Sequence, residues 1–382
     1  MKPLCIDLFS GGGGMSIGFK NAGYEVIGYE YKKDIVKNAR NNGLNTKEAD
    51  IFADNFVEKL ENDIGSRGIY IIVGGPPCQP FSQANKRGLG QYDVRNGIDA
   101  FLNIVKIKQP QYFLMEEAPT LTWPGHMDYL NQILDKITQI GYKFIFKNCD
   151  MSYFLVPQKR KRTIIIGRRG VTSIPKTLLS NETQNQFKIC NVLSRKEIES
   201  VKILPEGEIR HNNFSNSSNN ADNEISRYPK SVIRRIYEKY EVRPGKPTKG
   251  CALKQSRILN INKPSLTLSI CSLKCHTLSA MPNNGARFAF LVEGERLKLL
   301  DELSNEKKES FKENVVQRTL TVHEMRRIQT FPDTYKFTSR KLAQTIIGNS
   351  VPPKFANILA NRLKPEVIEQ LSLSVNLSRL KF

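Results

Sequence analysis

Residues 4–21 read LCIDLFSGGGGMSIGFKN, a short apolar run that passes through four glycines into an amphipathic segment. This pattern predicts a strand over Leu4 to Phe9 and a helix over Gly14 to Asn21. The glycines between them let the backbone turn sharply and approach a ligand without a clash from Cβ. Such a turn is typical of a nucleoside-cofactor site. The strict G-x-G-x-x-G pattern fails at Ser16, however, so an ordinary tight turn stays an alternative.

The same alternation of strands and helices continues to about residue 170. Further helices are expected at Ile98 to Lys108 and Met127 to Ile140, and further strands at Tyr24 to Tyr29, Tyr70 to Val73, Tyr112 to Met115, Lys143 to Lys147 and Thr163 to Gly167. This alternation indicates βαβ units and a mostly parallel sheet. Ligands bind such sheets at the carboxyl ends of the strands. Glu30, Cys78 and Glu116 each follow a predicted strand, so we expect them to converge there.

The composition changes after the first 170 of the 382 residues. From about 171 to 317, prolines interrupt the pattern, and His211 to Asn223 is polar and rich in turn formers. This favours a loop-rich second domain with an exposed loop at that stretch. Helical periodicity returns over Arg318 to Pro332, and Gln344 to Pro353 is expected to open a final helix.

The net charge of +21 favours a polyanionic partner, with nucleic acid as the first candidate, although a lysine-rich solvated surface would carry the same charge. Seven scattered cysteines without a CxxC pair are typical of reduced thiols rather than of a disulfide framework. No apolar run approaches the roughly 18 residues that span a bilayer. We therefore expect a cytoplasmic protein with no membrane partner, acting as a monomer.

The run Gly74-Gly75-Pro76-Pro77-Cys78-Gln79 places a cysteine in a stiffened loop. Two prolines make a regular helix through it improbable. A free cysteine is usually a buried filler, but a filler needs neither paired prolines nor paired glycines. The following segment is polar, basic and contains glycines, which suits a loop that closes over a phosphate backbone. Its candidate DNA-binding residues are Gln79, Ser82, Lys86, Arg87 and Arg95.

Two acidic residues near the glycine turn can serve as hydrogen-bond acceptors for a nucleoside. Glu30 ends the second predicted strand, 19 residues after Gly11, and suits ribose hydroxyls. Asp50 follows a predicted third strand and suits an adenine amino group. A helix N-cap is the alternative role for Asp50.

Six motifs in order resemble the motif set of the bacterial DNA cytosine-5 methyltransferases of restriction-modification systems. They are Asp7 to Gly14, Pro76 to Gln79, Glu116, Gln158-x-Arg160-x-Arg162, Arg318 to Pro332 and Gln344 to Pro353. The resemblance implies a Rossmann-like S-adenosylmethionine-dependent methyltransferase sheet with a smaller, loop-rich target-recognition domain. It also implies a catalytic domain over 1–170, a recognition domain over 171–339 and a segment over 340–382 that completes the catalytic domain.

The resemblance further implies roles for single residues. S-adenosylmethionine would be the methyl donor, and duplex DNA the substrate. Cys78 would attack carbon 6 of a flipped cytosine, Glu116 would hold nitrogen 3, and Arg162 would bind the carbonyl at position 2 with Arg160 nearby. The implied cofactor residues are Phe9, Ser10, Gly11, Gly13, Glu30, Tyr31, Asp50, Ile51, Pro77, Asn349 and Ser350.

Three positions depart from the family's usual pattern. Glu116-Glu117-Ala118 stands where Glu-Asn-Val is usual, so an acid replaces the asparagine that would support the cysteine loop. This second carboxylate is expected either to alter the protonation of Glu116 or to point into solvent. Phe154-Leu155-Val156-Pro157 lacks the usual glycine before the Pro-Gln step, and Thr330 also stands where glycine is common.

The middle of the chain carries weaker signals. Lys263 to Thr267 resembles a short segment of the family's recognition domain, although a turn entering a strand would read the same. Candidates for base or phosphate contact are Arg227, Arg234, Arg235, Arg243 and Arg257. Cys271, Cys275 and His276 supply three zinc ligands where four are needed, and only distant Cys251 or His211 could complete the site, so no metal is expected.

Two other functions remain open at this level. One is the tRNA-methylating branch that shares these motifs, and the other is a catalytically silent DNA-binding relative. A cognate restriction endonuclease, acting separately, is a possible partner of the leading function.

Overall fold

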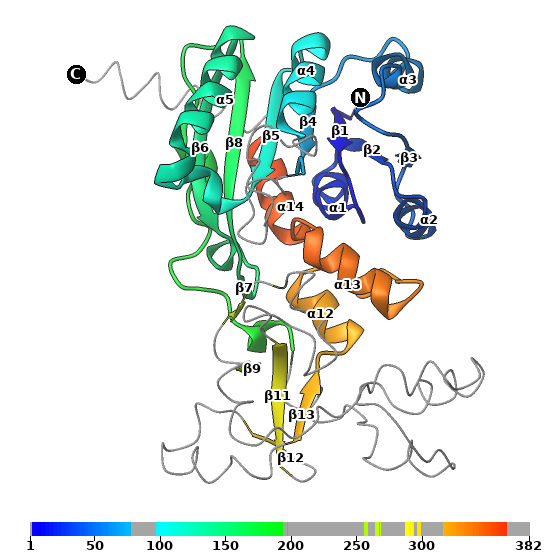
Figure 1. Cartoon of the computed structure of the whole chain (residues 1–382), viewed down its shortest axis with the longest axis vertical. Helices are drawn as coiled ribbons and strands as arrows, with labels where there is room; N and C mark the ends of the chain where they lie inside the picture. Colours follow the sequence, from blue (N-terminus) through cyan, green and yellow to red (C-terminus); the bar gives the residue numbers. More distant parts are fainter. Residues whose placement is uncertain are drawn as a thin grey trace.

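The computed structural model describes residues 2–77, 97–193, 197, 256–258, 264–266, 268, 287–293, 296–298 and 316–364 (Figure 1). Several predicted sites therefore lie outside the described residues. They are Cys78, Gln79, Ser82, Lys86, Arg87, Arg95, the stretch His211 to Asn223, Arg227, Arg234, Arg235, Arg243, Cys271, Cys275 and His276. Arg257 lies in a strand of which only the backbone is described.

A seven-stranded sheet forms the centre of the larger part, in the order β3-β2-β1-β4-β5-β8-β6. Its strands are β1 (Leu4–Leu8), β2 (Glu25–Glu30), β3 (Thr46–Glu48), β4 (Ile71–Gly74), β5 (Tyr112–Glu117), β6 (Tyr142–Asp150) and β8 (Lys161–Arg169). Strands β3, β2, β1, β4 and β5 run parallel, whereas β8 runs antiparallel between β5 and β6. The mostly parallel α/β sheet is confirmed, and each predicted strand overlaps an observed one.

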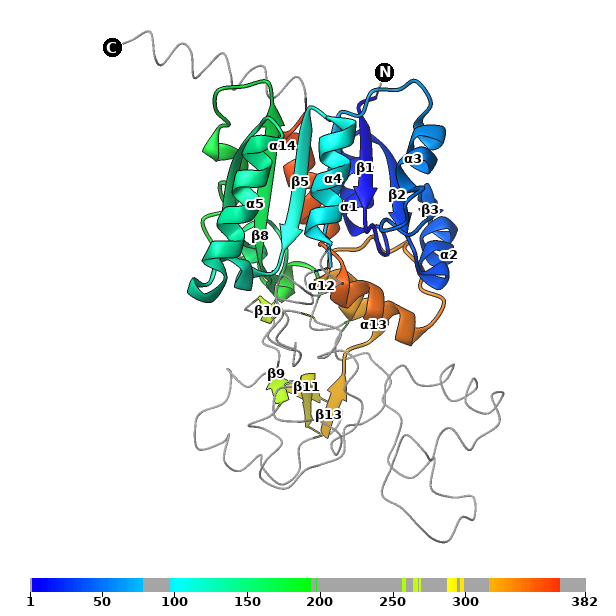
Figure 2. The same cartoon turned by 45° about the horizontal axis from the view of Figure 1, so that its top comes forward.

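Helices cover both faces of this sheet (Figure 2). On one face, α3 (Phe56–Ile64), α4 (Ile98–Lys108) and α5 (Met127–Gln139) bury Leu60, Phe101 and Ile133. On the other face, α1 (Gly14–Asn21) and α14 (Pro353–Arg362) pack against each other and bury Phe19 and Phe355. Helix α14, near the end of the described residues, thus covers helix α1.

A third apolar cluster joins the sheet to residues further along the chain. Helices α2 (Lys33–Asn41), α12 (Val322–Ile328) and α13 (Arg340–Asn349) contribute Ile35, Met325 and Ile346, and Leu268 packs with them. Beyond this cluster lie β9 (Ser256–Ile258), β11 (Arg287–Glu293), β12 (Arg296–Lys298) and β13 (Val316–Thr319), in which β11 pairs with the other three (Figure 1). The division of the chain at residues 170 and 339 stays a prediction.

Two predicted helix boundaries near the C-terminus were wrong. Residues 318–319 end β13, and α12 begins only after Thr321, which forms a capping box with Glu324. The stretch from Gln344 to Pro353 does not open a helix but contains the end of α13 and the first residue of α14. The break falls there because a proline lacks the backbone N–H that a helix interior needs, yet fits a first helical position.

Candidate active site

The glycine loop between β1 and α1 has the backbone that a close ligand approach requires. Gly11 and Gly13 have φ of 55° and 82°, and Phe9 shares this left-handed region with φ of 57°. The Ser10 N–H donates to the Tyr29 carbonyl at 2.9 Å, which ties the loop to β2. The buried Ser10 hydroxyl has no hydrogen-bond partner among the described residues, so a polar atom is available at this turn.

Glu30, at the end of β2, holds its carboxyl group against this loop. Its Oε2 accepts from the Gly11 N–H at 3.1 Å and its Oε1 from the Lys32 N–H at 2.9 Å. Burial raises the pKa of Glu30, while the backbone N–H bonds and the Lys32 charge oppose that rise. Each carboxylate oxygen keeps a further lone pair, so Glu30 can still accept from a ligand hydroxyl.

A turn after β3 brings further predicted cofactor residues to the same edge. Asp50 is exposed, and its Oδ1 accepts from the Phe52 N–H at 3.0 Å, so it caps a turn rather than a helix. Ile51 is buried, whereas Tyr31 is 60% exposed. Phe52 is 48% exposed, and its ring centroid lies 6.0 Å from that of Phe9. The sequence analysis missed Phe52, although an aromatic residue directly after Asp50-Ile51 was a usable signal.

The C-terminal segment closes the back of the glycine loop. A Cβ on Gly12 would lie 2.1 Å from Ile346 Cγ2, and one on Gly14 would lie 2.1 Å from the Val351 carbonyl oxygen. The Tyr335 hydroxyl donates to the Gly12 carbonyl at 2.7 Å. Tyr335 was also missed, because nothing near it in the sequence links it to a loop 323 residues away.

Asn349 and Ser350, both predicted for the cofactor pocket, differ in exposure. Asn349 is exposed, whereas Ser350 is buried and its hydroxyl donates to the Ile346 carbonyl at 2.7 Å. Asn349 is therefore the one of the two whose side chain is accessible to a ligand.

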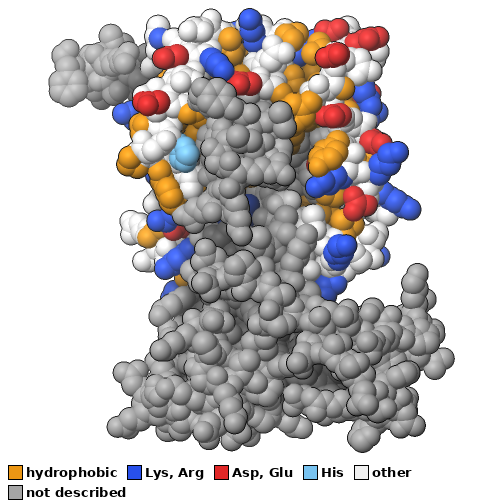
Figure 3. Space-filling view, viewed as in Figure 1, with side chains coloured by type: hydrophobic (Ala, Val, Ile, Leu, Met, Phe, Trp, Pro, Cys, Tyr) orange, Lys and Arg blue, Asp and Glu red, His pale blue; other side chains and the backbone are white. Residues whose placement is uncertain are grey.

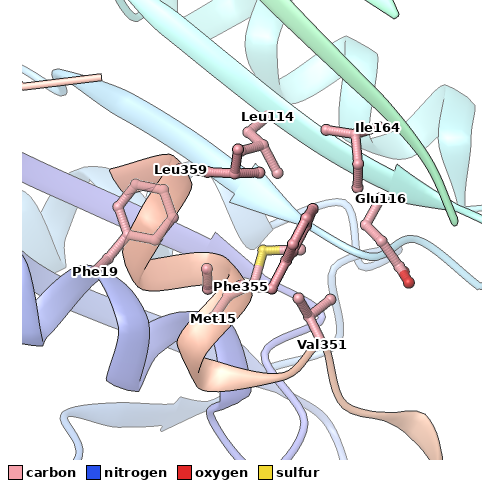
Figure 4. A pocket seen from close by; sticks show the side chains of 9 residues that line it. Met15, Phe19, Leu114, Glu116, Ile164, Val351, Phe355 and Leu359 are labelled. Atoms are coloured by element: carbon pink, nitrogen blue, oxygen red, sulfur yellow. The ribbon is translucent and has the colours of Figure 1, made fainter. Parts of the chain in front are cut away.

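Glu116 lies inside β5 rather than after it, which corrects its predicted position. Its carboxyl group is nearly buried, and its Oε1 lies 2.7 Å from the Nε of Arg162 at the start of β8. Met15, Leu114, Val351 and other apolar side chains pack behind it, and the carboxyl end points away from them (Figure 4). An acid and a cation thus sit together at the carboxyl edge of the sheet.

The start of the cysteine segment lies between the glycine loop and Glu116. A Cβ on Gly75 would lie 3.0 Å from Glu116 Oε2. A Cβ on Gly97 would lie 2.4 Å from Pro77 Cδ and 3.1 Å from the Phe9 ring. Pro77 and Phe9 therefore both lie beside Gly97, while Gly75 lies beside Glu116.

Glu117 turns to the opposite face of β5 from Glu116, because successive strand residues alternate. It is 1% exposed, so the expectation that it points into solvent was wrong. Burial, helped by the nearby Glu116 charge, raises the pKa of Glu117 well above its usual value. Its Oε1 has no hydrogen-bond partner among the described residues. Burial of this oxygen without a partner favours the protonated, neutral form of Glu117.

Arg160 is 1% exposed, and its guanidinium lies 3.4 Å from the Leu268 carbonyl and 3.5 Å from that of Gly348. Arg162, two residues on, has the contact with Glu116. The structure thus brings Arg162 to the acid and Arg160 to backbone carbonyls from two other segments.

Charges of both signs occur on the face of the described part that Figure 3 shows. On the face seen in Figure 3, Lys and Arg side chains lie among Asp and Glu side chains. Within the described ranges, no group of three or more His, Cys, Asp or Glu side chains is arranged to hold a metal ion. The described helices include none that is both long and apolar enough to cross a membrane.

The sequence model of the C-5 cytosine-specific DNA methylases matches residues 4–365. The chain belongs to this family. As a methylase of this family it is a DNA (cytosine-5)-methyltransferase, and the family takes its methyl group from S-adenosylmethionine.

Relatives match the methylase along nearly its whole length. It is 26% identical to the type II methyltransferase M.FnuDI of Fusobacterium nucleatum over 96% of the chain and 95% of the relative. It is 28% identical to the type II methyltransferase M.HindV of Haemophilus influenzae, over 94% of the chain and 95% of that relative.

Solved structures share the fold of the methylase. The S. pombe Dnmt2 methyltransferase superimposes with a TM-score of 0.61 at 14% identity, covering 97% of this chain and 99% of that one. A putative DNA modification methyltransferase of an E. coli prophage gives a TM-score of 0.58 at 19% identity, covering 95% and 98%. At these identities the likeness concerns the fold alone.

Proposed function

We propose that the methylase transfers a methyl group from S-adenosylmethionine to carbon 5 of cytosine within a specific sequence of duplex DNA, by covalent attack of Cys78 on a flipped base. One observation carries the proposal. The Glu116 carboxyl, paired with Arg162, adjoins Gly75, three residues before Cys78, while Pro77 and Phe9 of the glycine loop both lie beside Gly97. A base held at Glu116 and a methyl donor held at Phe9 would therefore flank the cysteine segment.

The cofactor pocket is proposed to lie along the glycine loop, β2 and the turn after β3. Glu30 would accept from the ribose hydroxyls, Tyr31 and Ile51 would contact the adenine, and Asp50 would accept from its amino group through the oxygen that Phe52 does not use. The proposed contacts are completed by Phe9, Ser10, Gly11, Gly13, Pro77, Asn349 and Ser350. The bound cofactor supplies an electrophilic methyl group on a sulfonium.

The proposed chemistry follows from the weakness of carbon 5 as a nucleophile. Addition of the Cys78 thiolate to carbon 6 would convert the ring into an enamine-like species with electron density at carbon 5. Glu116, as a carboxylic acid that donates its proton or a hydrogen bond to nitrogen 3, would stabilise the negative charge that develops, and Arg162 would do the same at the neighbouring carbonyl. After methyl transfer, loss of the carbon 5 proton would expel Cys78. The base must leave the duplex stack for any of this.

The Glu116–Arg162 pair suits this task because nitrogen 3 and the carbonyl at position 2 are neighbouring acceptors on the pyrimidine edge, and each would need a donor as negative charge develops. The 2.7 Å contact between Nε and Oε1 fixes the two side chains relative to each other before the base arrives. Held in this way, they need little reorganisation when the base enters, which is how preorganised groups stabilise a transition state. Arg160, with its buried contacts, would support this arrangement rather than touch the base.

Target recognition is proposed for the region 171–339, and phosphate contact for Gln79, Ser82, Lys86, Arg87 and Arg95. The net charge of +21 supports a polyanionic partner. Because the matched relatives are type II methyltransferases, we also propose that the methylase belongs to a restriction-modification system. It would protect DNA from a cognate endonuclease that acts separately, and it would act as a monomer.

The test uses DNA that traps the covalent step. Bisulfite sequencing of DNA from cells that express the methylase identifies the methylated site. A duplex with 5-fluorocytosine at that site is then expected to form a denaturation-resistant adduct, because fluorine cannot leave as a proton does. No adduct, or one that persists in Cys78→Ser, would reject the mechanism. Methyl transfer to tRNA but not to duplex DNA would reject the substrate.

A further inference from the structure

A chain of buried hydrogen bonds joins three segments that are far apart in the sequence. The Leu268 N–H donates to Gln158 Oε1 at 2.8 Å, and Gln158 Nε2 donates to Gln329 Oε1 at 2.7 Å. Gln329 Nε2 then donates to the Ser350 carbonyl at 2.6 Å. Gln158 and Gln329 are both 0% exposed. We call these four linked residues the amide relay.

The two ends of the amide relay fix the orientation of both glutamine side chains. The Leu268 N–H can only donate, so Gln158 must present its oxygen there and its NH₂ group to Gln329. The Ser350 carbonyl can only accept, so Gln329 must present its NH₂ group there and its oxygen to Gln158. A rotated amide at either position would set like groups against each other, so the relay has one consistent arrangement.

One end of the amide relay lies in the middle of the chain. Leu268 follows β10 (Ser265–Leu266), which pairs in parallel with β7 (Gln158–Lys159). The Ser265 N–H also donates to the Pro157 carbonyl at 2.8 Å, and Leu268 is fully buried. If the segment from Ser265 to Leu268 moves when the middle region binds a ligand, its hydrogen bonds would therefore transmit that movement directly to Gln158.

The other end lies at the glycine loop. The Ser350 carbonyl belongs to the turn between α13 and α14, and a Cβ on Gly14 would lie 3.1 Å from Ser350 Cβ. Close packing of this kind leaves no room for the turn to move independently of the loop. A shift at Gln329 would therefore reach the proposed cofactor pocket.

We propose that Gln158 and Gln329 are positioning residues through which DNA binding by the middle region and cofactor binding at the glycine loop strengthen each other. The inference rests on the proposed function. Simple stabilisation of the fold would not require the relay to end at these two sites. Coupling between two binding sites is reciprocal, so each ligand must tighten the other by the same factor.

The test measures that factor. S-adenosylhomocysteine, which carries no methyl group to transfer, is titrated by calorimetry into the full chain. The titration is made with and without an unmethylated duplex that contains the target sequence identified by bisulfite sequencing. In the wild-type methylase the duplex is expected to tighten S-adenosylhomocysteine binding by about 5- to 150-fold, the usual range of coupling. In Gln329→Met, which keeps the side-chain volume but cannot donate or accept, the factor is expected to fall below twofold.

Two further variants separate coupling from stability. Tyr142→Phe removes a buried hydrogen bond of 2.6 Å to Pro110 far from the relay, and it is expected to keep the full factor. Gln158→Met removes both the acceptor for Leu268 and the donor to Gln329, so it is expected to lose the factor even if Gln329→Met fails to fold. The proposed function fails if the wild-type chain binds neither S-adenosylhomocysteine nor the duplex. The present inference alone fails if both bind independently, or if Gln158→Met keeps the wild-type factor.

Discussion

The buried acid at Glu117 leads to a prediction in which the effect of one substitution depends on pH. Glu117→Gln keeps the shape of the side chain and removes the charge. Because the folded-state pKa of Glu117 is raised above the unfolded value near 4.3, folding takes up a proton. The stability that this carboxyl group contributes is complete below that unfolded value and is lost as the pH rises toward the folded one. The advantage of glutamine is therefore expected to be small at pH 5 and larger at pH 8.

The size of this advantage follows from the burial of Glu117. A pKa raised by one unit corresponds to about 1.4 kcal/mol. Because Glu117 is 1% exposed and its pKa is raised well above the usual value, ionising it in the folded chain costs at least about that much. We expect Glu117→Gln to raise the free energy of unfolding by at least about 1.4 kcal/mol more at pH 8 than at pH 5.

Urea unfolding can be followed through Trp123, the single tryptophan of the chain, which lies six residues after Glu117. The comparison of variant with wild type at each pH removes the contribution of Asp7, whose pKa burial raises to about 7. Glu58→Gln, on the exposed side of α3, is the control and should show no difference between the two pH values. Equal gains for Glu117→Gln at both pH values, or a larger gain at pH 5, would refute the account of a buried acid that takes up a proton.

Two predictions concern backbone positions. Gly18→Ala would place a Cβ 2.4 Å from Ala356 Cβ and 2.6 Å from the Asn357 nitrogen. Overpacking of about 1–3 kcal/mol should outweigh the gain of about 1 kcal/mol in helix propensity, so the melting temperature should fall. Gly68→Ala, with nothing within 4 Å, is its control, and a Gly18→Ala chain as stable as wild type would contradict the close packing of α1 on α14. Thr330 has φ of 64°, so Thr330→Gly should be more stable to urea than Thr330→Ala by about 1 kcal/mol, and equal midpoints would argue against a left-handed backbone there.

Local patterns were enough to predict the elements of the sheet and the glycine loop. Strand periodicity and the position of Glu30 depend on a few neighbouring residues, and both match the structure. The stretch Phe154 to Pro157, which lacks the usual glycine, contains Leu155 with a left-handed φ of 59°, and Thr330 has a left-handed φ of 64°. At Thr330 the reason is local: it follows the end of α12, and its N–H and that of Phe331 donate to the Arg327 and Arg326 carbonyls, as in a Schellman motif.

Features that depend on distant partners could not be predicted in the same way. Gly12 and Gly14 tolerate no Cβ because Ile346 and Val351 pack against them, more than 300 residues later in the chain. Glu117 was misplaced because its burial depends on the helices that cover the other face of β5, which no spacing reveals. The amide relay joins residues 171 positions apart through two ordinary glutamines.

The direction of β8 explains how the amide relay and the Glu116–Arg162 pair can serve one reaction. Because β8 runs antiparallel to β5, with Ile164 opposite Glu116, its first residues lie at the same edge as the last residues of β5. A parallel strand would have carried Arg162 to the other edge, away from the acid. The short run from Gln158 through Arg160 to Arg162 therefore begins at the segment around Leu268 and ends at Glu116. A displacement of β10 on DNA binding would reach the Glu116–Arg162 pair along this run and the glycine loop through Gln329, so both halves of the proposed site would respond to the same event.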